Sequence, residues 1–190
     1  EHFGAELAGA VFAGACRRLS DELALMDPQT DSAIARHLCM GILPSGACYL
    51  SLLDSGVPQK EALGFVAKRI AAFSERTGRQ MARLCRRMPF PLFRYILKIM
   101  IATGYPRAGW DIDGMRHSSS NISFSMNSCL YLDTFRRMGC PELCAAYCDA
   151  DHIMFGALAP KILFSRQGTL EKGCCCCDFT FRRSGSVRRV

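Results

Sequence analysis

The thiols of one predicted helix and the carboxylate that follows them have the spacing best suited to chemistry in this sequence. Cys140, Cys144 and Cys148 recur every four residues, and Asp151 follows three residues after the last of them. At helical spacing Cys144, Cys148 and Asp151 project from one face about a turn apart. A deprotonated thiol is a nucleophile and a carboxylate is a general base. This helix face therefore predicts one wall of a reactive pocket.

A run of four cysteines, at positions 174–177, is the most conspicuous feature of the chain. We predict a strand over 175–182, and successive side chains of a strand point to opposite faces, so at most two of the four thiols can serve one site. No pair of CxxC motifs is present and the four histidines are scattered. This pattern weighs against a zinc site, and we expect no metal and no other cofactor.

Burial is the alternative explanation for each thiol, because free cysteine often acts as a small apolar core residue. We favour this interpretation for four cysteines in predicted helices of the first half: Cys16, Cys39, Cys48 and Cys85. Cys148 and Cys177 differ because each has a carboxylate nearby in sequence. A carboxylate raises the pKa of a neighbouring thiol, so a nucleophilic thiolate here requires Arg166, His152 or a helix N-terminus to offset it.

Length and composition predict an ordinary globular protein. The 190 residues are 49% apolar and 22% charged, which excludes a disordered chain and suits one domain with a substantial core. No apolar run approaches the roughly 20 residues of a membrane span, and we recognise no secretion signal. Twelve cysteines in such a chain indicate free thiols in a reducing compartment, so we expect a cytoplasmic protein.

The net charge of +7 is modest for a protein that binds nucleic acid. One predicted helix carries a basic stripe formed by Arg79, Arg83, Arg86 and Arg87. Like charges at this spacing repel one another, so the stripe is either solvated surface or an anion-binding face. No aromatic residues interleave with it to stack on bases. We therefore expect no nucleic-acid partner and no membrane partner.

Hydrophobic periodicity and turn residues predict a helical first half and a mixed second half. The helices expected before residue 105 cover 3–25, 31–53 with a kink or break at Pro44, 60–76 with a stop at Gly78, a short helix with the basic stripe, and 92–102. The segment 104–121, which contains Trp110, is expected to be a boundary or an active-site loop. After it we expect a strand over 122–126, helices over 129–138 and 141–155, and a β-hairpin of strands 161–166 and 175–182.

These elements predict an α+β fold, in which a mainly helical N-terminal half packs with a small antiparallel sheet that includes the C-terminal β-hairpin. We expect one domain over residues 1–182, with a helical half of about 1–104 and a cysteine-rich α/β half of about 105–182. A basic tail, frayed in the manner of most termini, is expected over 183–190.

Several spaced motifs in the second half resemble the L-2-amino-thiazoline-4-carboxylic acid hydrolase family. In chain order they are Cys129, Gly139-x-Pro141-Glu142-Leu143, Cys148-x-x-Asp151, Arg166-x-x-Thr169-Leu170, Gly173 and Cys177-Asp178-Phe179. The resemblance covers residues 105–182, and the first half agrees in general outline. It implies hydrolysis of a cyclic amidine-like C–N or C–S linkage in a small-molecule carboxylate, with the aminothiazoline ring opened to N-carbamoyl-L-cysteine.

Motif position also implies the site residues. The catalytic candidates are Cys148, Asp151 and Cys177, and the substrate-binding candidates are Cys129, Arg166 and Thr169. We expect either Cys148 or Cys177 to attack the ring carbon, or a water molecule to attack it with Asp151 as the base. The alternative role for Asp151 is to pair with the protonated amidine and raise its electrophilicity. Arg166 is expected to clamp the substrate carboxylate with its planar fork, or else to be a surface residue of a strand.

Two interpretations from other classes of protein stay open on the sequence alone. The first is a small-ligand or metal-binding sensor domain with a cysteine-lined pocket. The second is an adaptor for nucleic acid or a membrane surface, which would bind through the basic stripe. The sequence does not predict the oligomeric state.

Overall fold

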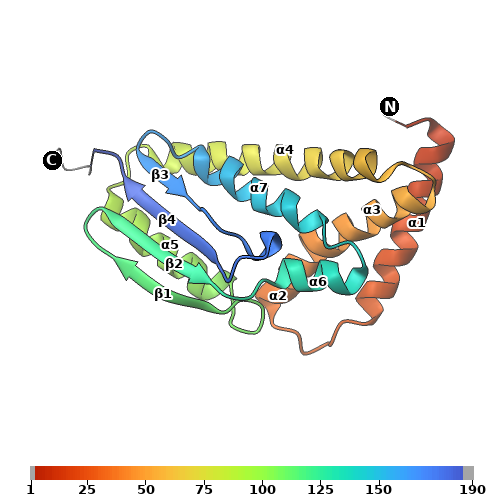
Figure 1. The fold of residues 1–190 in the computed structure, drawn as a ribbon, viewed down its shortest axis with the longest axis horizontal. Coiled ribbons are helices and arrows are strands. Elements are labelled where there is room, and N and C mark those ends of the chain that lie inside the picture. The colour runs from red at the N-terminus through yellow and green to blue at the C-terminus, as the bar shows by residue number, and fades with distance from the viewer. Residues whose placement is uncertain (1–2, 186–190) are drawn as a thin grey trace.

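The computed structural model describes residues 3–185 and confirms the α+β fold (Figure 1). Its helical elements are α1 (Ala5–Ala24), α2 (Ser32–His37), η1 (Leu38–Ile42), α3 (Leu43–Asp54), α4 (Gln59–Cys85), α5 (Phe90–Gly104), α6 (Leu130–Met138), α7 (Leu143–Gly156) and η2 (Leu170–Lys172). Its strands are β1 (Ile112–His117), β2 (Asn121–Met126), β3 (Ile162–Ser165) and β4 (Cys177–Arg183). Within the described residues, no helix is long and apolar enough to cross a membrane.

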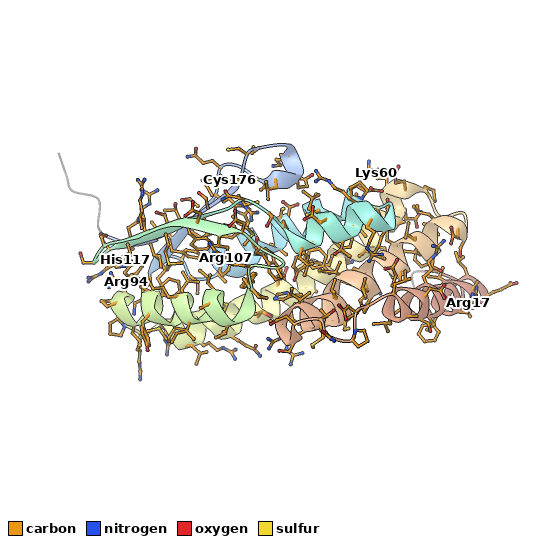
Figure 2. All side chains as sticks on the ribbon, turned by 90° about the horizontal axis from the view of Figure 1, so that it is seen from below. Arg17, Lys60, Arg94, Arg107, His117 and Cys176 are labelled. Carbon is orange, nitrogen blue, oxygen red and sulfur yellow. The ribbon has the colours of Figure 1, made fainter. Side chains whose placement is uncertain are left out.

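The four strands form one antiparallel sheet in the order β1-β2-β4-β3. Alternation along β2 and β4 directs one set of side chains to a buried face: Ile122, Phe124, Met126, Cys177, Phe179 and Phe181. Helix α5 packs on this face, as Figure 2 shows. Met126 and Cys177 are direct partners in the register, so the first thiol of β4 lies on the core face of the sheet.

Two hydrophobic clusters build the core. One surrounds α5 and the sheet, and the other lies among α3, α4, α6 and α7. Four partly buried residues contact both clusters: Leu38, Leu130, Tyr131 and Leu170. The junction between the two clusters is therefore where side chains from both halves of the chain meet.

Helix α4 is longer than the sequence predicts and lies beside α7 (Figure 1). The prediction that this helix stops at Gly78 is wrong, because α4 continues to Cys85. Gly78 is buried against α7, and a Cβ atom there would lie 2.7 Å from the backbone oxygen of Met154. The glycine thus permits close helix packing and does not end the helix. The basic stripe therefore lies on the last turns of α4 and just beyond them, not on a separate short helix.

Asp31 caps the first turn of α2, and the expected break lies slightly earlier than Pro44. The Asp31 carboxylate accepts hydrogen bonds from the backbone N–H groups of Ala33 and Ile34, at 2.8 and 3.3 Å. The chain then passes through the π-helical turn η1 before α3, and Pro44 lies in the first turn of α3. Proline lacks a backbone N–H, so it suits this position.

The expectation of a loop over 104–121 is wrong in one part, because the segment contains strand β1. Five of the six residues of β1 are exposed, so the strand lacks the alternation that identifies a half-buried strand in a sequence. Trp110, just before β1, is almost fully buried.

The C-terminal hairpin is confirmed, with β3 and β4 paired antiparallel. The predicted start of its second strand at residue 175 is wrong, since β4 begins at Cys177 and residues 174–176 belong to the connecting loop. Figure 2 shows Cys176 in this loop, on the side of the molecule away from α5. Strand β4 also includes Arg183, where the basic tail was expected to begin, while residues 186–190 of that tail lie outside the described part of the chain.

Candidate active site

A cavity of about 690 Å³ lies at the junction of the two core clusters. Helices α3, α4, α5 and α7 and the core face of the sheet contribute to its lining. Five of the six residues expected at the site line it: Cys129, Cys148, Asp151, Arg166 and Cys177. They come from the start of α6, from α7, from the loop after β3 and from the start of β4. The fold thus brings together residues that are dispersed over about 50 positions of the sequence.

The Asp151–Arg166 ion pair is the centre of the site. Nη1 of Arg166 donates to Oδ2 of Asp151 at 2.7 Å, and Nη2 donates to the backbone oxygen of Cys148 at 2.6 Å. The Arg166 side chain is only 2% exposed, and its guanidinium carbon lies 5.1 Å from the centre of the Phe179 ring. Arg166 is therefore not a surface residue. Its fork is already used by Asp151 and a carbonyl, and Nε is buried without a partner.

The Asp151 side chain is more exposed than the Arg166 side chain, its ion-pair partner. It is 30% exposed because it faces the cavity, although protein surrounds it on its other sides. This burial raises the pKa of Asp151 to about 6, against the opposing effect of the Arg166 charge and hydrogen bond. A carboxylate with such a pKa is ionised at neutral pH and accepts a proton more readily than an ordinary aspartate, which suits a general base.

Cys129 has the environment that most favours a thiolate. The neighbouring Cys144 thiol is the largest effect that lowers the pKa of Cys129, to about 7. Cys129 is also the N-cap residue of α6, and the N–H groups of Leu132 and Tyr131 stabilise its negative charge without forming full capping hydrogen bonds. Burial opposes these effects.

The other thiols of the cavity have different surroundings. Burial raises the pKa of Cys177 to about 11, and its sulfur accepts a hydrogen bond from the backbone N–H of Leu170 at 3.3 Å. The neighbouring Cys129 thiol, and after it Cys148, raises the pKa of the buried Cys144 thiol. Cys148 is half-buried on the same face of α7 and lines the cavity. The expected thiol and carboxylate wall therefore exists, and Cys129 completes it from another helix.

Thr169 lies outside the cavity lining. Its hydroxyl accepts a hydrogen bond from the backbone N–H of Lys172 at 3.3 Å and so caps the short helix η2. Asp178 holds the same loop, because its carboxylate accepts hydrogen bonds from the N–H groups of Gln167 and Gly168. These motif residues shape the loop that carries Arg166 into the site.

His37 lines the cavity beside Tyr131, although no motif in the sequence predicted it there. Nδ1 of His37 lies 2.8 Å from the Tyr131 hydroxyl, and Nε2 lies 3.0 Å from the carbonyl oxygen of Gly104. A carbonyl only accepts, so Nε2 carries the proton and Nδ1 of the neutral ring accepts from Tyr131. Burial lowers the pKa of His37, with a further contribution from Arg36. No local signal marks His37, because its partners lie 67 and 94 positions away.

Histidine, cysteine and acidic side chains form no metal-binding arrangement in residues 3–185: no group of three or more of them is placed to hold an ion.

The α+β architecture and this cavity define a class of protein with a solvent-accessible site of small-molecule size. A family model described as L-2-amino-thiazoline-4-carboxylic acid hydrolase matches residues 35–181, which is more than half of the chain. The chain belongs to this family, and the resemblance inferred from the motifs is confirmed. Comparison with curated proteins and comparison with solved structures each gave no match.

Proposed function

We propose that this chain is a hydrolase that opens a cyclic amidine-like C–N/C–S linkage in a small carboxylate substrate. Membership of the hydrolase family supports the class of reaction. The observation that carries the proposal is the presence, in one cavity, of the Asp151 carboxylate beside Arg166 and the Cys129 thiol at the N-terminus of α6. One group is suited to accept a proton and the other to attack an electrophilic carbon.

In the direct route, Asp151 is the general base for water. It accepts a proton as the water oxygen adds to the ring carbon between sulfur and nitrogen. The C–S bond then breaks, its electron pair leaves with sulfur, and the proton on Asp151 passes to that sulfur. The net change is the addition of one water molecule, and the product carries a urea group and a thiol.

In the covalent route, the Cys129 thiolate adds to the same carbon and the ring C–S bond breaks, which leaves an isothiourea on the enzyme. Water then gives a proton to Asp151 as its oxygen adds to that carbon, and the Cys129 thiolate leaves. The proton passes from Asp151 to the substrate sulfur, giving the same product. Cys129 is a better candidate nucleophile than Cys177, because the pKa of about 7 provides a thiolate at neutral pH and a pKa of about 11 does not. Cys148, between Cys144 and Asp151 on α7, is the alternative thiol.

Arg166 has a positioning role in this proposal. Its fork is engaged by Asp151 and the Cys148 carbonyl, so it holds the base in place and keeps it ionised. Arg36 and Arg69 also line the cavity and are the better candidates to bind the substrate carboxylate. Thr169 supports the loop of Arg166 from outside the cavity.

Incubation with L-2-amino-thiazoline-4-carboxylate, followed by mass spectrometry of carbamoylcysteine, tests the proposal. We expect turnover by the parent chain and a loss of about 100-fold or more for Asp151→Asn, in the range of removing a general base. Asp149→Asn is the matched control, because Asp149 is an exposed carboxylate on the same helix. Cys129→Ser, Cys148→Ala and Cys177→Ala separate the two routes.

The parent chain must turn over this ring acid or a substituted relative of it for the proposal to hold. Binding without turnover would favour the small-ligand sensor. Equal activity of Asp151→Asn and Asp149→Asn would remove Asp151 as the base. Activity that survives all three thiol substitutions would leave only the direct attack by water.

A further inference from the structure

The cavity is far larger than the ring acid in the family description requires. That acid has about nine non-hydrogen atoms, and even at roughly 30 Å³ for each water-sized group it takes less than half of the space. The cavity volume of about 690 Å³ lies instead in the range of sites that enclose drug-sized ligands. A substrate that fills this cavity therefore carries a further group in addition to the ring acid.

The unused part of the cavity is apolar. Along α7, the polar lining residues Cys144, Cys148 and Asp151 come before Met154 and Phe155, so the chemistry of the lining changes toward the C-terminal end of this helix. Beyond that point the lining comes from α5 and the core face of the sheet, with Leu97, Ile101, Phe124, Phe179 and Phe181. Such a surface contributes favourably to the binding free energy when it contacts an apolar group, because both surfaces are then removed from water.

Apolar side chains also stand exposed where the cavity meets solvent. Met40 of η1, Phe73 of α4 and Met100 of α5 line the cavity and are exposed, with Phe73 at 71%. Exposed large apolar residues gathered around an opening are typical of a ligand entrance.

The charges near this opening are positive. Arg36 and Arg69 line the cavity, and within residues 3–185 Asp151 is the one acidic side chain of the lining, already paired with Arg166. The field at the entrance therefore favours an anion over a cation.

We propose that the substrate is an amphiphilic carboxylic acid, whose ring-bearing head is opened at the thiol and carboxylate groups and whose extended apolar chain occupies the space between α5, the sheet and the end of α7. The reaction of the head rests on the proposed function. The binding of an apolar chain and a carboxylate does not, and it is measured separately.

Calorimetric titration with acetate, hexanoate and decanoate, each below its micelle concentration, tests whether the cavity binds an alkyl chain. Each buried methylene strengthens binding up to roughly fourfold, so we expect decanoate to bind on the order of 100-fold more tightly than hexanoate. Arg69→Gln is expected to weaken binding of hexanoate and decanoate by a similar factor, because it acts on the shared carboxylate. Affinity that does not increase with chain length would overturn the proposal.

Two variants test where the alkyl chain of the ligand lies in the cavity. Phe73→Gln changes the entrance, and we expect it to weaken decanoate binding about tenfold; Leu84→Gln is its control, since Leu84 is 72% exposed on the same helix but does not line the cavity. Leu97→Phe narrows the inner space and is expected to weaken decanoate more than hexanoate, with circular dichroism to verify folding. Equal effects of Phe73→Gln and Leu84→Gln on decanoate would refute the assigned entrance.

Turnover of aminothiazoline carboxylates with N-methyl and N-octyl substituents tests hydrolysis of the ring and binding of the alkyl chain in one experiment. We expect a higher kcat/KM for the octyl compound in the parent chain and a smaller difference in Leu97→Phe. If carboxylates bind with the expected dependence on chain length but no ring compound is opened, the hydrolase function is refuted and the amphiphile site stands. If the methyl compound is opened as fast as the octyl compound, the hydrolase stands and the amphiphilic substrate is refuted.

Discussion

Substitution of Arg166 by methionine is expected to destabilise the protein by an amount that depends strongly on pH. Methionine keeps much of the length of the side chain and removes its charge. The change deletes the hydrogen bonds to Asp151 and to the Cys148 carbonyl, which together contribute about 1–3 kcal/mol. It also leaves Asp151 without a cation in a largely buried position, and this second cost exists only while Asp151 is ionised.

The sign of the pH effect follows from the pKa of Asp151. That pKa is raised from 3.8 to about 6 in the folded protein, so the folded state holds the proton more tightly and the free energy of unfolding falls as pH rises through this window. Without Arg166 the pKa of Asp151 rises further, by about 1–3. The free energy of unfolding of the variant therefore continues to fall as the pH rises toward 8. At about 1.4 kcal/mol for each pH unit, Arg166→Met should cost about 1.4–3 kcal/mol more at pH 8 than at pH 5.

Urea unfolding of the parent and the variant at pH 5 and pH 8 measures this difference. The control is Arg18→Met, which breaks the Arg18–Asp54 pair, whose side chains are 40% and 59% exposed. An exposed pair of this kind contributes about 0–1 kcal/mol, and its removal should cost the same at both pH values. If Arg166→Met costs equally at pH 5 and pH 8, Asp151 is not an ionised partner of Arg166, and its assignment as the base loses its physical basis.

Two further predictions concern a thiol and a glycine. Iodoacetamide at pH 7 should alkylate Cys129 at least tenfold faster than Cys177, with rates resolved by peptide mass spectrometry, because their pKa values are about 7 and about 11; equal rates would contradict the assigned thiolate. Gly78→Ala should destabilise the fold by about 1–3 kcal/mol, since its Cβ would meet the backbone of α7. Gly64→Ala, on the same helix with open space at its Cβ, should instead stabilise it by about 0.5–1 kcal/mol, and both are measured by urea unfolding.

The sequence by itself determined the features that depend on neighbours in the chain. Asp31 begins a helix and Gly139 ends one, because a cap and a left-handed residue act on adjacent backbone groups. The alternation at 122–126 marks a half-buried strand, and helical spacing aligns Cys144, Cys148 and Asp151. These patterns, together with the spaced motifs, were sufficient to predict the fold class and the family.

Only the tertiary structure decided which of these residues have unusual chemistry. The pKa of a side chain depends on its burial and on charges and donors that come from distant parts of the chain. Cys129 has a lowered pKa because Cys144 approaches it, and Arg166 is buried because the loop capped by Thr169 places it against α7. The residue types of the candidate site are therefore set by the sequence, while packing shifts the pKa values of Cys129 and Asp151.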